Sequence, residues 1–117
     1  MDKNLKGLKP ELVWKHFAAI CEIPHPSHEE DAIRAYIVKW AEELGLEHKV
    51  DEAQNVYVYK PATAGMEDRK GIILQAHTDM VPQKNNDTEF NFSTDPIEAY
   101  IDGERVTANG TPLGADN

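Results

Sequence analysis

Three residues of the sequence carry side chains that could hold a metal ion or move a proton. His77 and Asp79 lie two positions apart in the run IILQAHTDMVP, and Asp116 lies in the small-residue turn GADN. Imidazole nitrogens and carboxylate oxygens are ligands that zinc accepts in proteins. These side-chain types point to metal-assisted chemistry, provided that the fold brings them to one place.

The element before His77 decides whether His77 and Asp79 can act together. Residues 71–76, GIILQA, form an apolar run of the kind found in strands that are covered on both faces. Residues i and i+2 of a strand point to the same side, and ligands of α/β sheets usually bind where strands end. The histidine could then bind a metal while the aspartate orients its ring. An exposed loop pair with no metal is the alternative, because His-x-Asp is a common pattern.

Asp116 is the second part of the candidate site. Gly114 and Ala115 allow a close bend of the backbone before it, so its carboxylate could be held at a tight site and bridge two metals. A helix N-cap or an Asx-turn would explain the same residue without a metal. Catalytic zinc usually has three protein ligands, and the sequence has no His-Glu-x-x-His, no cysteine pair and no Gly-x-Ser-x-Gly.

Two helices are predicted ahead of these residues. Pro10 suits position N1 of a first helix, in which Val13, Phe17, Ile20 and Cys21 recur at helical spacing. The segment IPHPSHEE, residues 23–30, interrupts this pattern, because its two prolines favour extended backbone before them. We interpret the two histidines of this segment, His25 and His28, as structural residues.

The second helix is predicted to begin at Ser27. Ser27 and Glu30 form a capping-box pattern, and Gly45 is placed to be the C′ residue. The apolar stripe of this helix consists of Ile33, Tyr36, Ile37, Trp40 and Leu44.

Strand patterns follow the helices. Residues 47–52 and 55–61 alternate with a period of two, and Val56 and Val58 alternate with two tyrosines. Residues 97–108 predict a hairpin with Asp102 and Gly103 in a type I′ turn. Together with residues 71–76, these strands predict an α/β domain in which helices flank a mixed sheet.

Composition narrows the class of protein. The 117 residues suit one domain, and the net charge of −9 comes without a basic block, so nucleic acid is not an expected partner. No apolar run reaches membrane-spanning length and no signal peptide is visible, so we expect no membrane partner. The single cysteine, Cys21, cannot form an internal disulfide and fits a reducing compartment. We therefore expect a cytoplasmic protein.

The combination of motifs is more specific than its parts. LQAHTDMVPQK followed by GTPLGADN, with EIPHPSHEE before a helix, resembles the M20 family of metallopeptidases and, within it, the aminoacyl-histidine (Xaa-His) dipeptidases. The resemblance runs along the whole chain and implies that residues 1–117 are the amino-terminal part of a catalytic domain with a zinc-peptidase-like fold. Pro112 stands where the branch typically has threonine.

The resemblance also implies roles for the three residues. His77 corresponds to a metal ligand, Asp79 to the residue that orients this histidine and assists the general base, and Asp116 to the ligand that bridges two divalent ions, zinc or else manganese or cobalt. The general-base glutamate and the remaining ligands of the family have no counterpart in these residues. We therefore expect the parent protein to hydrolyse dipeptides, and this segment alone to be inactive and to self-associate.

Three points stay open from the sequence. The chain could be a non-catalytic binding domain of the same ancestry, or part of a related carboxypeptidase or deacylase. A dipeptide is the substrate that the resemblance implies, but specificity for Xaa-His rests on the resemblance alone. A homodimer of the parent is one oligomeric state among those that remain open.

Overall fold

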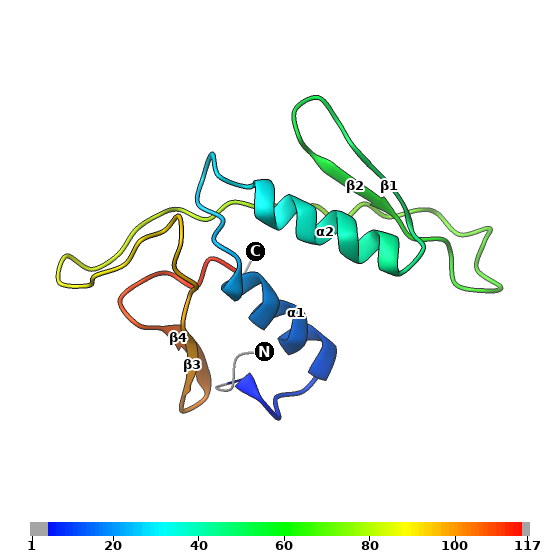
Figure 1. The fold of residues 1–117 in the computed structure, drawn as a ribbon. Helices are drawn as coiled ribbons and strands as arrows, with labels where there is room; N and C mark the ends of the chain where they lie inside the picture. Colours follow the sequence, from blue (N-terminus) through cyan, green and yellow to red (C-terminus); the bar gives the residue numbers. More distant parts are fainter. Residues whose placement is uncertain (1–4, 116–117) are drawn as a thin grey trace. The chain divides into compact units, whose positions relative to one another are not determined.

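Helices and strands both occur, as the α/β class requires. The structure is a computed structural model that describes residues 5–115. The elements are α1 (Glu11–Glu22), α2 (Asp31–Glu43), β1 (Glu47–Val50), β2 (Val56–Tyr59), β3 (Ala99–Asp102) and β4 (Arg105–Ala108), shown in Figure 1. The strands form two antiparallel pairs, β1 with β2 and β3 with β4. The predicted α/β class is confirmed, but the described strands form two small antiparallel sheets and not one mixed sheet.

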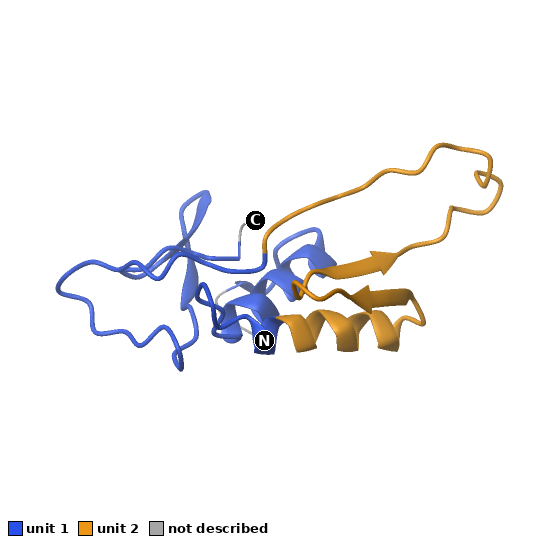
Figure 2. Ribbon diagram, turned by 90° about the horizontal axis from the view of Figure 1, so that it is seen from above, with its two compact units in different colours: residues 1–33, 78–117 blue, residues 34–77 orange. Residues whose placement is uncertain are grey.

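The chain divides into two compact units, which Figure 2 colours separately. Unit 1 consists of residues 1–33 and 78–117, and unit 2 consists of residues 34–77. Unit 1 therefore contains α1 and the β3–β4 hairpin, and unit 2 contains the β1–β2 hairpin. Neither helix in the described part of the chain is long and apolar enough to cross a membrane.

The core of unit 1 forms around one face of α1. Ala18 and Cys21 are each only 1% exposed, whereas Val13, which the helical spacing placed on the apolar face, is 58% exposed. Trp14 and Phe17 contact each other edge to face, with ring centroids 5.6 Å apart. The buried cluster consists of Leu5, Ala18, Cys21, Met80, Ile97 and Ala99. Residues from both segments of unit 1 therefore share one core.

The start of α1 differs slightly from the prediction. Pro10 is the N-cap residue and not the first helical residue, with φ of −69° and ψ of 137°. The fixed φ of proline fits this extended conformation as well as a helical one. The negative charge of Glu11 in the first turn is favourable beside the positive end of the helix dipole.

Helix α2 begins four residues later than the capping-box pattern predicted. The first helical residue is Asp31, and the Ser27 hydroxyl donates to groups outside the helix. Glu30 accepts a hydrogen bond of 2.9 Å from the backbone N–H of His28. The capping-box pattern predicted the N–H of Ser27, one residue earlier, as the donor. The prediction of a helix start at Ser27 was wrong because the Ser27 hydroxyl donates to the Asp79 carboxylate and does not accept from the N–H groups of a first helical turn.

The end of α2 is as predicted. Gly45 has a φ of +66°, its N–H donates to the Glu42 carbonyl, and the Leu46 N–H donates to the Ala41 carbonyl. These two bonds form a Schellman motif with Gly45 at C′.

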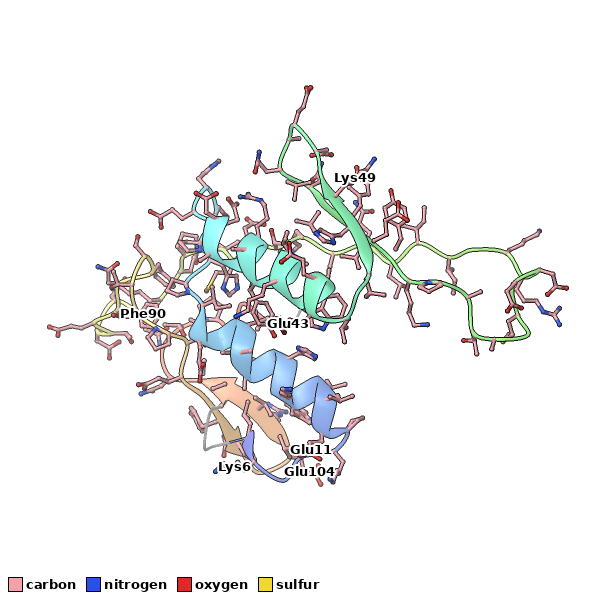
Figure 3. All side chains as sticks on the ribbon, turned by 45° about the vertical axis from the view of Figure 1, so that its right-hand side comes forward. Lys6, Glu11, Glu43, Lys49, Phe90 and Glu104 are labelled. Atoms are coloured by element: carbon pink, nitrogen blue, oxygen red, sulfur yellow. The ribbon has the colours of Figure 1, made fainter. Side chains whose placement is uncertain are left out.

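The two hairpins confirm the predicted strand segments and the predicted hairpin of residues 97–108, whose turn is shifted by one residue. In unit 2, Val56 and Val58 are half-buried and the alternating tyrosines are exposed, and Lys49 of β1, labelled in Figure 3, lies over the Tyr57 ring. In unit 1, Asp102 pairs with Arg105, so the turn consists of Gly103 and Glu104 and not of Asp102 and Gly103. Glycine at the first turn position is typical of type II′.

Residues 71–76 do not form the predicted buried strand. Ile72, Ile73 and Leu74 are 89%, 92% and 93% exposed, and no strand of the described residues pairs with them. A strand is stable only when neighbours accept its backbone hydrogen bonds and cover its side chains. Within the described residues no strand pairs with this apolar run and no side chains cover it, so the run is not a strand.

The close contact between Gly114 and Met80 yields a stability prediction. Gly114 has a φ of +65°, and a Cβ on it would lie 2.7 Å from Met80 Sδ. Gly103 has a similar φ of +60° but nothing within 4 Å of its Cβ position. Gly103→Ala should cost about 1–2 kcal/mol from the left-handed backbone alone, and Gly114→Ala about 1–3 kcal/mol more from overpacking.

Urea unfolding of both variants measures this difference. Trp14 fluorescence in a Trp40→Phe background reports on unit 1, because Trp14 packs against its core. An equal decrease in the free energy of unfolding in the two variants would contradict the predicted clash with Met80.

A carboxylate in the β1–β2 turn yields a pH prediction. The Asn55 side-chain amide donates to Asp51 Oδ2 at 2.9 Å, the Asn55 backbone N–H to Oδ1 at 2.8 Å, and the Tyr57 hydroxyl to Oδ2 at 3.2 Å. These bonds, the Asn55 side chain first, hold the pKa of Asp51 below its ordinary value. Their stabilisation of the hairpin is therefore present above the unfolded-state pKa and is lost as the pH falls through the lowered folded-state pKa.

Carbon-13 NMR of the Asp51 carboxyl should show a titration midpoint below that of an unstructured aspartate. Asn55→Ala should raise the midpoint, and Asn86→Ala in the other unit should leave it unchanged. A midpoint that does not respond to Asn55→Ala would refute the assignment.

Candidate functional site

The structure describes two of the three predicted site residues. His77 is exposed and is the last residue of unit 2, and Asp79 is half-buried in unit 1. Asp116 lies outside the described residues. Neither His77 nor Asp79 lies in a strand, so their convergence on one side of a strand stays a prediction.

The carboxylate of Asp79 is held by Ser27. Ser27 Oγ donates a hydrogen bond of 2.5 Å to Asp79 Oδ2, and it lies 3.4 Å from the Met80 carbonyl oxygen. A hydroxyl bound to an ionised carboxylate forms a short and comparatively strong bond. One oxygen of the candidate catalytic carboxylate therefore has a fixed partner 52 residues away in the sequence.

Backbone pairing places these two side chains together. The Met80 N–H donates to the His25 carbonyl at 2.9 Å, and the Ser27 N–H donates to the Met80 carbonyl at 3.1 Å. Pro26 and Met80 thus form an isolated parallel bridge. Pro26 and Met80 are both buried, and proline lacks the N–H that would need a further partner. The bridge sets Ser27 beside Asp79.

The His25 ring connects the same segment to the turn that precedes Asp116. His25 is 1% exposed; its Nδ1 lies 2.5 Å from the Ile23 carbonyl oxygen, and its Nε2 lies 2.6 Å from that of Gly114. A carbonyl oxygen can only accept, and a neutral imidazole carries one N–H, so the tautomer of His25 decides which of the two ring nitrogens donates. The interpretation of His25 as a structural residue agrees with this burial.

The described residues do not by themselves form a metal site. No group of three or more His, Cys, Asp or Glu side chains in residues 5–115 is arranged to hold a metal ion. The types of donor at His77 and Asp79 fit a zinc-type ion, but catalytic zinc usually takes three protein ligands. Ligands beyond the described residues are therefore required for any metal that these two residues serve.

Ser27 is the residue at this site that the sequence patterns missed. Its spacing to Glu30 matches a capping box, and this local pattern concealed the distant acceptor. The signal in the sequence was the pair Pro24 and Pro26, which keeps the preceding residues extended and able to pair with another segment. Nothing in the sequence identified Met80 as the partner.

Comparison with known proteins gives an independent view of these residues. No protein-family model matches the chain. The chain is 58% identical over 114 residues to the cytosol non-specific dipeptidase of Escherichia coli K12, a match that covers 97% of this chain and 24% of that protein. The chain thus spans about a quarter of the length of this relative.

A solved structure gives the same result. The crystal structure of aminoacylhistidine dipeptidase from Vibrio alginolyticus matches with a TM-score of 0.91 and 56% identity, over 96% of this chain and 23% of that one. Both matches extend over nearly all of the chain, and both proteins are named as dipeptidases. The resemblance to the M20 aminoacyl-histidine dipeptidases that the motifs predicted is thereby confirmed for a segment of about a quarter of their length.

Proposed function

We propose that residues 1–117 form the amino-terminal part of the catalytic domain of a metal-dependent dipeptidase. The observation that supports this most strongly is the 58% identity to a dipeptidase along 97% of the chain. A non-catalytic binding domain does not need a part-buried hydrogen bond that orients the Asp79 carboxylate. The short bond from Ser27 to the Asp79 carboxylate therefore favours the enzyme over a non-catalytic binding domain.

Within this proposal each site residue has a distinct role. His77 and Asp116 would hold the divalent ions, with Asp116 shared between them, and Asp79 would orient His77 and assist proton transfer at the general base. The ions, zinc or else manganese or cobalt, would polarise the scissile carbonyl and lower the pKa of a bound water. His77 is an exposed residue, and Ser27 donates a hydrogen bond to the Asp79 carboxylate.

Dipeptides are the proposed substrates, with Xaa-His dipeptides as the more specific expectation. The names of the two relatives differ on this point, because one is called non-specific and the other aminoacylhistidine dipeptidase. We propose a cytoplasmic location, since the relative from Escherichia coli is named as a cytosol enzyme.

Kinetics of the full-length protein test the proposed function. We expect hydrolysis of dipeptides that end in histidine when zinc, manganese or cobalt is present, and loss of activity after chelation. Asp79→Asn should lower kcat by about 100-fold or more, because it removes a group that assists proton transfer. The control Asp68→Asn alters an exposed carboxylate in the 61–70 loop and should leave kcat unchanged.

The same assay distinguishes the rival enzymes. Cleavage of longer peptides from their carboxyl end, or of N-acyl amino acids, without dipeptide hydrolysis would favour a carboxypeptidase or a deacylase. No hydrolysis of any dipeptide with any of the three metals would refute the proposal.

The exposed apolar run gives a second test of the proposed domain. If residues 1–117 belong to a larger catalytic domain, residues 71–76 should be paired and covered there. Backbone amides of Ile72, Ile73 and Leu74 should then exchange hydrogen at least about 100-fold more slowly in the full-length protein than in the isolated chain. Amides of the polar 61–70 loop are the internal control and should exchange rapidly in both. Equally rapid exchange of Ile72–Leu74 in both proteins would contradict the proposed domain.

A further inference from the structure

We infer that Ser27 is a positioning residue for Asp79, holding its carboxylate in the orientation that catalysis requires. The inference rests on the proposed function, because it takes Asp79 as a catalytic group. It adds a residue from the loop between α1 and α2 to the machinery of the site.

The contact is specific in its geometry. The Ser27 hydroxyl donates to one named oxygen, Asp79 Oδ2, at 2.5 Å, and both residues lie in unit 1. An aspartate side chain can rotate about χ1 and χ2, and a short hydrogen bond to one carboxylate oxygen restricts both rotations. The bond therefore selects one orientation of the Asp79 carboxylate.

The donor is itself held in place before any substrate binds. The backbone of Ser27 is bonded to the Met80 carbonyl, and Met80 is bonded to the His25 carbonyl. Donor and acceptor each lie one residue from the Pro26–Met80 bridge, and Met80 is only 4% exposed. Supporting residues that are fixed by packing and backbone bonds are what a precise catalytic group needs.

The other role available to Ser27 is helix capping, and the structure argues against it. A capping serine bonds the backbone N–H groups of the second or third helical residue. Helix α2 begins only at Asp31, and the Ser27 hydroxyl contacts Asp79 and Met80 instead. Ser27 acts on the residues next to the candidate site.

The expected effect of removing the hydroxyl follows from this role. In Ser27→Ala the hydrogen bond from the Ser27 hydroxyl to Asp79 Oδ2 is lost, and the orientation of the carboxylate is less restricted. Because Asp79 serves the chemical step and not the affinity for substrate, kcat should fall by about 10-fold while KM changes less than about 2-fold. Ser27→Thr keeps a hydroxyl on the same carbon and should restore most of the activity.

A matched control exists in the same unit. Ser93 Oγ donates to Glu29 Oε2 at 2.8 Å, which is also a serine-to-carboxylate bond, but both groups are exposed and neither is a candidate site residue. Ser93→Ala should therefore leave kcat and KM unchanged.

The experiment compares the full-length wild-type protein with Ser27→Ala, Ser27→Thr and Ser93→Ala. For each protein, kcat and KM are measured on a dipeptide that the wild type cleaves, together with the bound metal content and the midpoint of thermal unfolding. If Ser27→Ala does not fold, Ser27→Cys replaces it, because a thiol is of similar size and a weak donor.

The outcomes separate the inference from the proposed function. A fall in kcat for Ser27→Ala alone, with rescue by threonine and unchanged metal content, supports the inference. Unchanged kcat in Ser27→Ala overturns it while leaving the dipeptidase proposal intact, and so does a loss of kcat that only follows unfolding or loss of metal. A wild-type protein that cleaves no dipeptide overturns the proposed function and the inference with it.

Discussion

The backbone pairing of Met80 with His25 and Ser27 is the interaction on which unit 1 depends. Two hydrogen bonds, of 2.9 and 3.1 Å, join the loop that follows α1 to a segment more than fifty residues later in the sequence. Met80 belongs to the buried core cluster and packs against Gly114, whose carbonyl contacts the His25 ring. The core, the loop that follows α1 and the turn at Gly114 therefore all contact Met80, and Asp79 is the residue next to Met80 in the sequence.

This arrangement links stability to the candidate chemistry. Met80, which belongs to the buried core, also accepts the backbone hydrogen bond that holds Ser27, and the Ser27 hydroxyl in turn binds the Asp79 carboxylate. Substitutions in the loop of residues 23–27 would therefore alter both folding and the orientation of Asp79. Separating the two effects requires variants such as Ser27→Thr, which keeps the donor and leaves the backbone pairing unchanged.

Local patterns predicted the elements whose stability is local. The end of α2 at Gly45, the strands β1 and β2, and the β3–β4 hairpin followed from turn chemistry and period-two alternation, because these elements are formed by residues close in sequence. The strand at residues 71–76 failed because a buried strand depends on neighbours, and the described residues provide none. The capping box at Ser27 failed for a related reason, since a carboxylate distant in sequence is the partner of its hydroxyl.

The candidate site was predictable only in part. The types and spacing of His77, Asp79 and Asp116 made them candidates, but spacing alone could not show which groups support them. The decisive experiment is zinc-edge anomalous diffraction from crystals of the full-length protein grown with zinc. If His77 and Asp116 are metal ligands, zinc lies within about 2.0–2.2 Å of a His77 ring nitrogen and of an Asp116 oxygen, with Ser27 still bonded to Asp79. Zinc bound at other residues, with His77 and Asp116 remote from it, would show that these residues do not form the metal site.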